Sequence, residues 1–305
     1  MNFSAEQINQ LRITYLQGGN LTQLIRKWDM PIDEQTITFI YEMQAGTYTQ
    51  NTLEHPNQSK LFTDEIVKTL SKFVGAEDLL LDCGTGEATT LIPIMSALQV
   101  RKALAFDISY SRLSWAAENL KKSSLNVELA VASIRDIPLP SDSIDCVLTI
   151  HAIEPNGGFE DEILSELARV TKNYLFLVEP DFESASKAQK DRMESLNYIG
   201  SLGTSIVKSG LKVVQKTPII NNSNAMNKAS VFVLKKNRVN DDSREKNELR
   251  FGLDRLWVDP VLREPLRNFS TGLINNSGLW YPILNGIPFL RPTDTQLVLS
   301  PYKSG

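Results

Sequence analysis

The sequence predicts an α/β fold, with a doubly wound, mainly parallel seven-stranded sheet that ends in an antiparallel hairpin, an N-terminal helical extension and a small C-terminal β-rich module. Three observations predict this class. Apolar segments of strand length alternate with segments of helix length over residues 78–208. Two strand-like segments, 211–218 and 228–235, follow with no helix between them, which is typical of a hairpin. The 305 residues, 42% of them hydrophobic and 22% charged, suffice for one large domain and a small one.

The first predicted helix begins after Ser4, because this hydroxyl can cap it while Gln7 reaches back as in a capping box. Residues 18–20, Gly-Gly-Asn, end it. The apolar spacing predicts three more helices before the first strand, at 21–28, 33–44 and 62–74. Thr63 or Asp64 would cap the last of them.

The central part of the chain alternates between the two kinds of element. Strands are predicted at 78–83, 102–107, 126–131, 144–150 and 173–179. Helices are predicted at 88–98, 110–121, 160–171 and 187–208. Such alternation favours right-handed crossovers and a parallel sheet with helices on both faces.

A change of composition divides the C-terminal third, because residues 235–250 are almost entirely polar. We therefore expect four parts: an N-terminal helical extension (1–60), a ligand-binding domain (61–236), a linker (237–250) and a small module (251–305).

Composition excludes several classes. With 32 Lys and Arg against 36 Asp and Glu, the net charge is −4, so no overall basic field favours nucleic acid and we expect no DNA partner. The two cysteines, Cys83 and Cys146, lie in apolar segments and cannot form a disulfide framework or a cysteine zinc site. No apolar run reaches the ~18 to 20 residues of a membrane helix, and the N-terminus lacks the pattern of a signal peptide. A cytoplasmic protein without membrane contact is expected.

The segment 79–88, LLLDCGTGEA, carries the strongest chemical signal: a buried strand, a glycine loop and a helix. Gly84 and Gly86 let the backbone turn tightly and approach a ligand, and the helix start offers free N–H groups. Such a loop can hold a nucleotide-like ligand, although dinucleotide-binding folds have a similar one. Glu87 disfavours a pyrophosphate because it places a carboxylate where the phosphates would lie.

Two carboxylates after later strands fit an adenosine ligand. Asp107 ends the second strand, where it can accept hydrogen bonds from a ribose diol, although an NAD ribose would fit the same position. Asp136 follows the third strand and could accept from an adenine amino group, with Ile134 or Ile137 against the ring.

The segments 79–88, AFDIS at 105–109 and IRDIPLPSDSIDCVLT at 134–149, with the closing hairpin, resemble the class I S-adenosylmethionine-dependent methyltransferases of the type 11 kind over roughly residues 60–235. This resemblance implies S-adenosyl-L-methionine (AdoMet) as cofactor, Gly84 and Gly86 beneath its methionine part, and Asp107 on the ribose. The residues expected to bind the cofactor are Asp82, Gly84, Thr85, Gly86, Asp107, Ile108, Ile134, Arg135 and Asp136. Ala88 departs from the third glycine that the family often has.

Residues 257–292 resemble the small zinc-binding activator subunit of tRNA and protein methyltransferases. That subunit typically has Cys-Pro-x-Cys and then Tyr-Pro-Ile-x-x-Gly-Ile-Pro, whereas this chain has Asp259 and Leu262 at the cysteine positions and keeps the second motif at 281–288. We therefore expect no metal, and a protein partner or self-association through 251–305 stays possible. The two resemblances together match a fused architecture associated with bacterial surface-polysaccharide methyltransferases.

The loop after the fourth strand is the candidate acceptor site, because ligands of open α/β sheets bind at the carboxyl ends of the strands. His151 could act as general base, Glu154 could orient it, and Asn156 could hydrogen-bond a ligand. Two other interpretations stay open: His151 could be satisfied by backbone groups, and Glu154 and Asn156 could form a turn that caps the next helix.

Further polar residues have two interpretations each. Residues 179–181, Glu-Pro-Asp, could reach the acceptor or only end the fifth strand, and the second option is favoured. Tyr48 and His55 could close over AdoMet as a lid or could serve packing.

These observations predict an AdoMet-dependent methyltransferase (EC 2.1.1.-) for a small-molecule or sugar-type acceptor, possible settings being surface-polysaccharide or secondary metabolism. The chain lacks the Asn/Asp-Pro-Pro-Tyr/Phe motif of DNA amino-methyltransferases after the fourth strand. The alternatives are an RNA-modifying methyltransferase, suggested by the activator-like module, and a non-catalytic AdoMet-binding scaffold.

Overall fold

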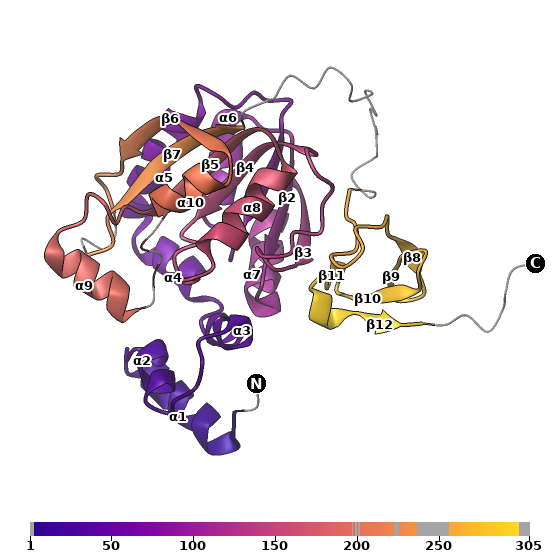
Figure 1. Cartoon of the computed structure of the whole chain (residues 1–305), viewed down its shortest axis with the longest axis horizontal. Coiled ribbons are helices and arrows are strands. Elements are labelled where there is room, and N and C mark those ends of the chain that lie inside the picture. Colours follow the sequence, from indigo (N-terminus) through magenta and orange to yellow (C-terminus); the bar gives the residue numbers. More distant parts are fainter. Residues whose placement is uncertain are drawn as a thin grey trace, which may run out of the picture.

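A seven-stranded sheet with helices on both faces forms the body of the protein, as the sequence predicts (Figure 1). The computed structural model describes residues 3–196, 198, 200, 202–222, 226–236 and 256–298. The predicted linker, 237–250, lies outside the described residues. In the described parts of the chain, no helix has both the length and the apolar character needed to cross a membrane.

The sheet has the strand order β3-β2-β1-β4-β5-β7-β6. The strands are β1 (Leu79–Cys83), β2 (Lys102–Asp107), β3 (Asn126–Val131), β4 (Ile144–Ile150), β5 (Thr171–Pro180), β6 (Leu211–Pro218) and β7 (Ala229–Lys236). The first five pair in parallel, whereas β7 is antiparallel to both β5 and β6. The predicted terminal hairpin is therefore confirmed, with β7 inserted next to β5 and β6 at the edge. Parallel pairing brings the carboxyl ends of β1, β2 and β4 to one edge of the sheet.

Helices pack on both faces of this sheet. They are α5 (Pro56–Leu70), α6 (Leu91–Leu98), α7 (Tyr110–Lys121), α8 (Glu160–Val170) and α10 (Leu202–Lys208), whereas α9 (Lys187–Ser195) projects away from the sheet (Figure 1). The predicted helix over 88–98 begins only at Leu91, because Ala88 has a left-handed backbone with φ of 57°. The single helix predicted over 187–208 is wrong: the chain leaves α9 at Leu196 and resumes helical geometry at Leu202.

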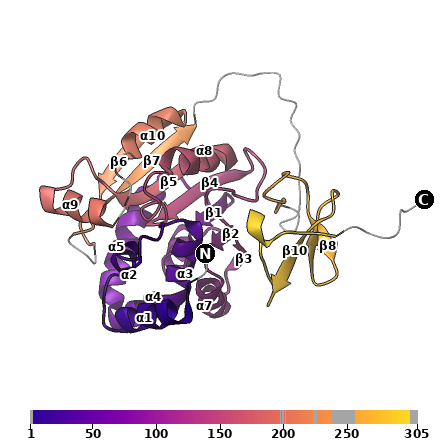
Figure 2. The ribbon, with the colours of Figure 1, turned by 60° about the horizontal axis from the view of Figure 1, so that its bottom comes forward.

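Four short helices precede α5: α1 (Ala5–Leu16), α2 (Leu21–Arg26), α3 (Glu34–Met43) and α4 (Thr47–Glu54). They gather on one side of the domain (Figure 2). The predicted capping box of Ser4 and Gln7 is confirmed. The prediction that α5 starts near residue 62 is wrong, because this helix begins at Pro56. Proline is favoured in the first turn of a helix, where the N–H that it lacks would have no acceptor within the helix. Thr63 and Asp64 therefore lie inside the helix and cap nothing.

Alternation along the strands sends neighbouring side chains to opposite faces and so builds two apolar layers. Leu81 and Phe106 belong to the layer that holds α8 and α10, whereas Leu80 and Ala105 belong to the layer beneath α5 and α6. All four side chains are essentially inaccessible to solvent. Because these side chains are buried on both faces of the sheet, the pairing register of the strands is fixed. The register in turn determines which polar side chains meet at the edge of the sheet.

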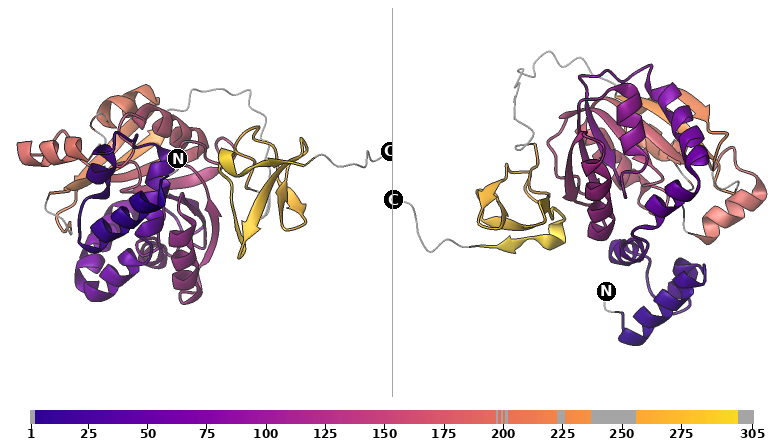
Figure 3. Two further views of the ribbon diagram at one scale, coloured as in Figure 1. Left: turned by 90° about the horizontal axis from the view of Figure 1, so that it is seen from below. Right: turned by 180° about the vertical axis from the view of Figure 1, so that it is seen from behind.

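The C-terminal module contacts the β3 edge of the large sheet (Figure 3). Its strands are β8 (Arg267–Phe269), β9 (Gly272–Ile274), β10 (Leu279–Leu284), β11 (Ile287–Pro288) and β12 (Gln296–Leu297). The Leu290 amide donates to the Val131 carbonyl at 2.7 Å, and Phe289 forms a parallel bridge with Val131. Arg291 Nη1 donates to the Ile108 carbonyl at 3.3 Å. The module thus covers an otherwise open edge strand and supports the loop after β2.

Asp259, the residue that the sequence resemblance aligns with a cysteine of the activator subunit, is fully buried in the module. Its carboxylate accepts from the amides of Val261 (3.0 Å), Leu262 (2.7 Å) and Glu264 (2.8 Å) and from Asn275 Nδ2 (3.2 Å). One carboxylate therefore joins two turns of the module through hydrogen bonds, the kind of cross-link that keeps a small fold together.

Candidate functional site

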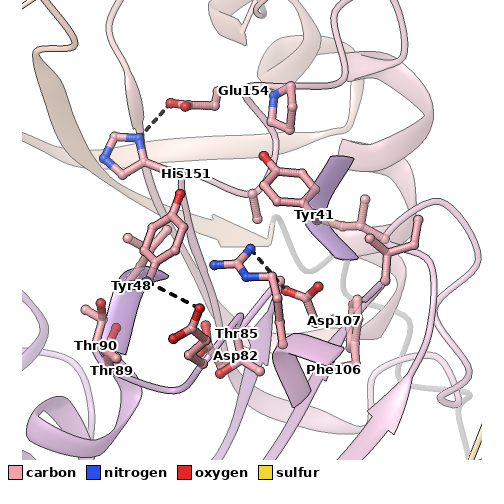
Figure 4. Close-up of a pocket in the computed structure, with 18 of the residues that line it drawn as sticks. Tyr41, Tyr48, Asp82, Thr85, Thr89, Thr90, Phe106, Asp107, His151 and Glu154 are labelled. Carbon is pink, nitrogen blue, oxygen red and sulfur yellow. Dashed lines mark hydrogen bonds and ion pairs between the residues drawn. The ribbon is translucent and has the colours of Figure 1, made fainter. Parts of the chain in front are cut away.

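A cavity of about 310 Å³ lies at the carboxyl ends of β1, β2 and β4, beneath α3, α4 and α5. Of the twelve residues proposed from the sequence for cofactor and catalysis, nine line it: Asp82, Gly84, Thr85, Asp107, Ile108, Ile134, His151, Glu154 and Asn156. Figure 4 shows His151 and Glu154 at the end of the cavity away from Asp82 and Thr85. The cavity therefore has a glycine-loop end and a His151 end.

The other three proposed residues do not line the cavity. Gly86 lies directly behind it, and its amide donates to Asp107 Oδ2 at 2.8 Å. Arg135 instead binds both oxygens of Glu162, at 3.0 and 2.9 Å. The Asp136 side chain is 44% exposed and lies 3.9 Å from Arg263 Nη2. The structure thus brings Gly86 to the site through its backbone and points Arg135 and Asp136 elsewhere.

The two loop glycines are required by close contacts as well as by backbone geometry. Both have positive φ, 77° at Gly84 and 57° at Gly86. A Cβ at Gly84 would lie 2.5 Å from the Ala152 Cβ, and one at Gly86 would collide with the guanidinium of Arg112. Any side chain at either position would therefore displace groups that form the cavity wall.

Asp107 is 3% exposed and is held by its neighbours at the end of β2. Oδ2 accepts from the Gly86 amide at 2.8 Å and Oδ1 from the Ser109 amide at 2.9 Å. Arg112 Nη1 lies 3.9 Å from Oδ2. A carboxylate has about four acceptor positions, so Asp107 can still accept hydrogen bonds from a diol in the cavity.

Arg112, which the sequence analysis did not identify, is 8% exposed and lines the cavity. Its guanidinium lies over the ring of Tyr48 at 4.4 Å and over that of Tyr41 at 5.1 Å. Its Nε has no hydrogen-bond partner among the described residues. In the sequence, Arg112 is only a charged residue between the apolar positions of α7, a pattern too common to identify a site residue. Arg112 joins the Asp107 carboxylate to two tyrosines of the N-terminal helices.

Glu87 connects the glycine loop to α4. Its carboxylate is 1% exposed and accepts from the amides of Gly46 (2.9 Å), Tyr48 (3.3 Å) and Thr49 (2.7 Å). These amides begin α4, which has no side-chain cap of its own. A carboxylate at a helix N-terminus satisfies free N–H groups and is favoured by the helix dipole. Glu87 thereby holds Tyr48 over the cavity, whereas His55 ends α4 and does not line the cavity.

His151 and Glu154 form a hydrogen-bonded pair at the other end. His151 Nδ1 lies 2.7 Å from Glu154 Oε2, which also accepts from Asn227 Nδ2 at 3.1 Å. His151 has a φ of 54°, a conformation that is rare outside glycine and recurs at functional sites. Because the carboxylate accepts at Nδ1, the other ring nitrogen, Nε2, is the one available to a ligand.

Glu179 fixes the loop that carries this pair. It is fully buried and accepts from the amides of Ala152 (3.1 Å), Ile153 (3.1 Å) and Glu154 (3.2 Å). It does not line the cavity, so it supports the acceptor loop and does not reach into it. Asn156 Nδ2 donates to the Ala152 carbonyl at 3.1 Å. Asn156 therefore stabilises the loop as well as lining the cavity.

The charges at this end influence one another. Burial lowers the pKa of His151, but the carboxylates of Glu154 and Glu179 outweigh it and leave the pKa above its ordinary value. Burial raises the pKa of Glu179 to about 7, against the effect of the nearby imidazole. Ligand atoms of the three side chains lie within 4.8 Å of one another, a spacing that could also hold a cation. The two carboxylates accept hydrogen bonds from the amides of the loop, from His151 and from Asn227, and so hold the imidazole in a fixed position.

Part of the chain is similar to known methyltransferases. Residues 80–174 match the family model described as a methyltransferase domain, which includes the glycine loop, Asp107 and His151. The chain is similar to a SAM-dependent methyltransferase from Aquifex aeolicus, with 22% identity, 61% of this chain and 95% of the other covered, and a TM-score of 0.46. It is also similar to a complex of the Haloferax volcanii Trm112 methyltransferase activator with a putative methyltransferase (13% identity, 62% and 94% covered, TM-score 0.49). A third similar structure is magnesium protoporphyrin IX methyltransferase from Synechocystis PCC 6803 with bound SAH (12%, 62% and 87%, 0.47).

Proposed function

We propose that the chain is an S-adenosylmethionine-dependent methyltransferase, which the match of residues 80–174 to a methyltransferase domain supports, and that it methylates a small, polar, sugar-type acceptor held between the N-terminal helices and the loop after β4. The observation that carries the proposal is the recessed position of the His151–Glu154 pair, whose side chains are 27% and 10% exposed. The cavity that contains the pair has a volume of about 310 Å³ and is roofed by residues of α3, α4 and α5. Enclosure favours a small molecule over a folded nucleic acid or a protein surface.

The residues of the glycine-loop end fit the cofactor. Gly84 and Gly86 leave room for a ligand against the loop, and Asp107 keeps acceptor capacity for the ribose hydroxyls. Ile108 and Ile134 offer apolar surface for the adenine. Burial raises the pKa of Asp82 to about 7, and a ligand ammonium beside it would restore its charged form.

The mechanism assigned to the chain is alignment plus proton removal. The bound cofactor supplies a methyl group on a sulfonium, which is already activated, so positioning of the acceptor provides much of the acceleration. His151 Nε2 accepts the proton of the attacking hydroxyl or amine, while Glu154 holds Nδ1 and stabilises the imidazolium that forms. Asn156 and Asn227 place amide groups beside the same space, which suits an acceptor with several hydroxyls.

An RNA-modifying activity is the second candidate, because the C-terminal module resembles an activator subunit of such enzymes. The observation against it is again the roof of α3 to α5 over the His151 end of the cavity. The net charge of −4 also offers no general attraction for a polyanion.

The test uses the full chain. AdoMet and S-adenosylhomocysteine, but not NAD, should raise the melting temperature, since a ligand at ~100 times its Kd stabilises the native state by about 2.7 kcal/mol. Incubation with AdoMet and a panel of sugar nucleotides should then yield S-adenosylhomocysteine. Binding of AdoMet without turnover on any small acceptor would favour the scaffold alternative, whereas turnover with unmodified tRNA would favour the RNA alternative.

A further inference from the structure

A second cavity, of about 380 Å³, lies against the first. Ile37, Tyr41, Tyr48, Glu154 and Pro155 line both cavities, so only these side chains separate them. The second cavity therefore adjoins Glu154 at the His151 end of the site, where the acceptor is expected, and its described lining includes no residue of the glycine loop.

The N-terminal helices and α9 enclose this space. Its wall includes the turn between α1 and α2, residues 18–20, and the α9 residue Arg192. Arg26 Nη1 of α2 donates to the Ser195 carbonyl at the end of α9 at 2.7 Å, which joins the two helices. Segments that are about 170 residues apart in the sequence thus form one chamber.

Polar groups dominate the described lining of the second cavity. Hydroxyl and amide groups come from Tyr15, Asn20, Thr22, Gln44 and Tyr198. Burial raises the pKa of Tyr198, and its neutral hydroxyl is hydrogen-bonded to Glu154. Such a wall suits a ligand that carries several hydroxyls.

Arg192 is the one basic residue among the described residues that line this cavity, and Glu154 is the one acidic residue. Glu154 is already engaged by His151 and Asn227. Arg192 Nη1, in contrast, is buried and has no hydrogen-bond partner in the described structure. Its guanidinium lies 5.5 Å from the centre of the Tyr198 ring, a position that fixes it without supplying an acceptor.

A buried donor of a charged group without an acceptor is unfavourable, and structures retain such groups where a ligand completes them. The acceptors that match a guanidinium best are planar or tetrahedral oxyanions, because it can donate two parallel hydrogen bonds to them. The unpaired Nη1 therefore indicates an anionic group of the ligand at this end of the chamber.

We propose that the second cavity binds the anionic part of the acceptor, a carboxylate or a phosphate, to which Arg192 donates hydrogen bonds. A hydroxyl elsewhere on the same acceptor then faces His151. This inference rests on the proposed function, since it names the substrate class for that site. It predicts acid sugars or sugar phosphates as acceptors and excludes neutral sugars of the same size.

The test compares glucuronate, glucose 1-phosphate, inorganic phosphate and neutral glucose as probes of the full chain saturated with AdoMet, by isothermal titration and by change in melting temperature. Glucuronate or glucose 1-phosphate should bind and glucose should not. Tighter binding of glucuronate assigns a carboxylate, whereas tighter binding of glucose 1-phosphate together with inorganic phosphate assigns a phosphate. The same weak binding for all four probes would overturn the proposal.

The variant Arg192→Gln should weaken binding of the preferred anionic probe about 10- to 100-fold, the loss expected for a charged hydrogen bond. Lys187→Gln is the matched control, because it removes one positive charge from an exposed position of the same helix. Equal anion affinity in Arg192→Gln and the unaltered protein would contradict the proposal.

Measurement of AdoMet binding distinguishes a failure of the proposed methyltransferase function from a failure of the assignment of the second cavity. The melting temperature shift caused by AdoMet alone should be the same in Arg192→Gln as in the unaltered protein, which also shows that the variant is folded. Failure of AdoMet to bind the unaltered protein would overturn the proposed function itself. Normal AdoMet binding without any anion preference would overturn only the assignment of the second cavity.

Discussion

The two ends of the main cavity are built from different kinds of group. The glycine-loop end consists of backbone amides and one carboxylate from adjacent strands. The carboxylate is Asp107, which accepts hydrogen bonds from the amides of Gly86 and Ser109. At the other end, side chains from remote segments meet, such as Tyr41 of α3, His151 after β4 and Asn227 before β7. The glycine-loop end is therefore built from neighbouring elements of the chain, whereas the His151 end forms only when remote segments come together.

The largest expected effect separates chemistry from cofactor binding. His151→Asn should lower kcat by about 10²- to 10⁴-fold, the usual contribution of a general base. Asparagine tolerates the left-handed backbone at this position, so the loop should keep its shape. The AdoMet dissociation constant, measured by isothermal titration, should not change. A variant with full kcat would remove His151 from the mechanism and would favour an acceptor that needs no base, such as a carboxylate.

Asp107→Ala tests the opposite end. AdoMet affinity should fall about 10- to 100-fold, because the ribose loses a charged acceptor and the amides of Gly86 and Ser109 lose theirs.

Asp136→Ala is the control for that substitution, since the sequence proposed both carboxylates for the cofactor. Asp136 does not line the cavity and its side chain is 44% exposed, so its affinity change should stay within about twofold. A large loss of AdoMet affinity in Asp136→Ala would show that the loop after β3 rearranges to reach the adenine.

Glu87→Ala tests the connection between the two ends. Three amides at the start of α4 would lose their acceptor, which should lower the free energy of unfolding by about 1 to 3 kcal/mol. Amide hydrogen exchange over α4 should increase. Glu54→Ala, at the exposed far end of the same helix, should change the free energy by no more than about 0.5 kcal/mol. Equal effects of the two substitutions would contradict the assigned role of Glu87.

Glu154→Gln should produce the smallest effect, a shift of the pH profile. The Glu154 carboxylate favours the imidazolium, so its removal should lower the pKa of His151 and move the rise of kcat with pH to lower pH. The raised pKa also makes the stability depend on pH. The His151–Glu154 pair stabilises the folded state fully below about pH 6.5, and this contribution is lost as the pH rises through the higher pKa that His151 has in the folded state. NMR titration of His151 in both proteins measures the shift; an unchanged or higher pKa would exclude Glu154 as the main influence.

The sequence was a good guide where the structural signal is local. The strands 102–107, 126–131 and 144–150 have the predicted bounds, because apolar runs between turns determine them. The sequence was a poor guide to α4 and to the start of α5. The N-terminus of α4 is capped by Glu87, which is 38 to 41 residues away in the sequence. Contacts over such separations leave no periodic pattern.

The fold class could be predicted from the alternation of apolar segments along the chain, and the glycine loop and Asp107 from residues within one strand, turn and helix. Folding brings Arg112 over the rings of Tyr41 and Tyr48, and it places Arg192 in the wall of a chamber formed with α1 and α2; neither position could be predicted from the sequence. The physical reason is the reach of the interactions. Backbone conformation is set by near neighbours, whereas the partners of a buried charge are set by whichever segments the apolar core brings together.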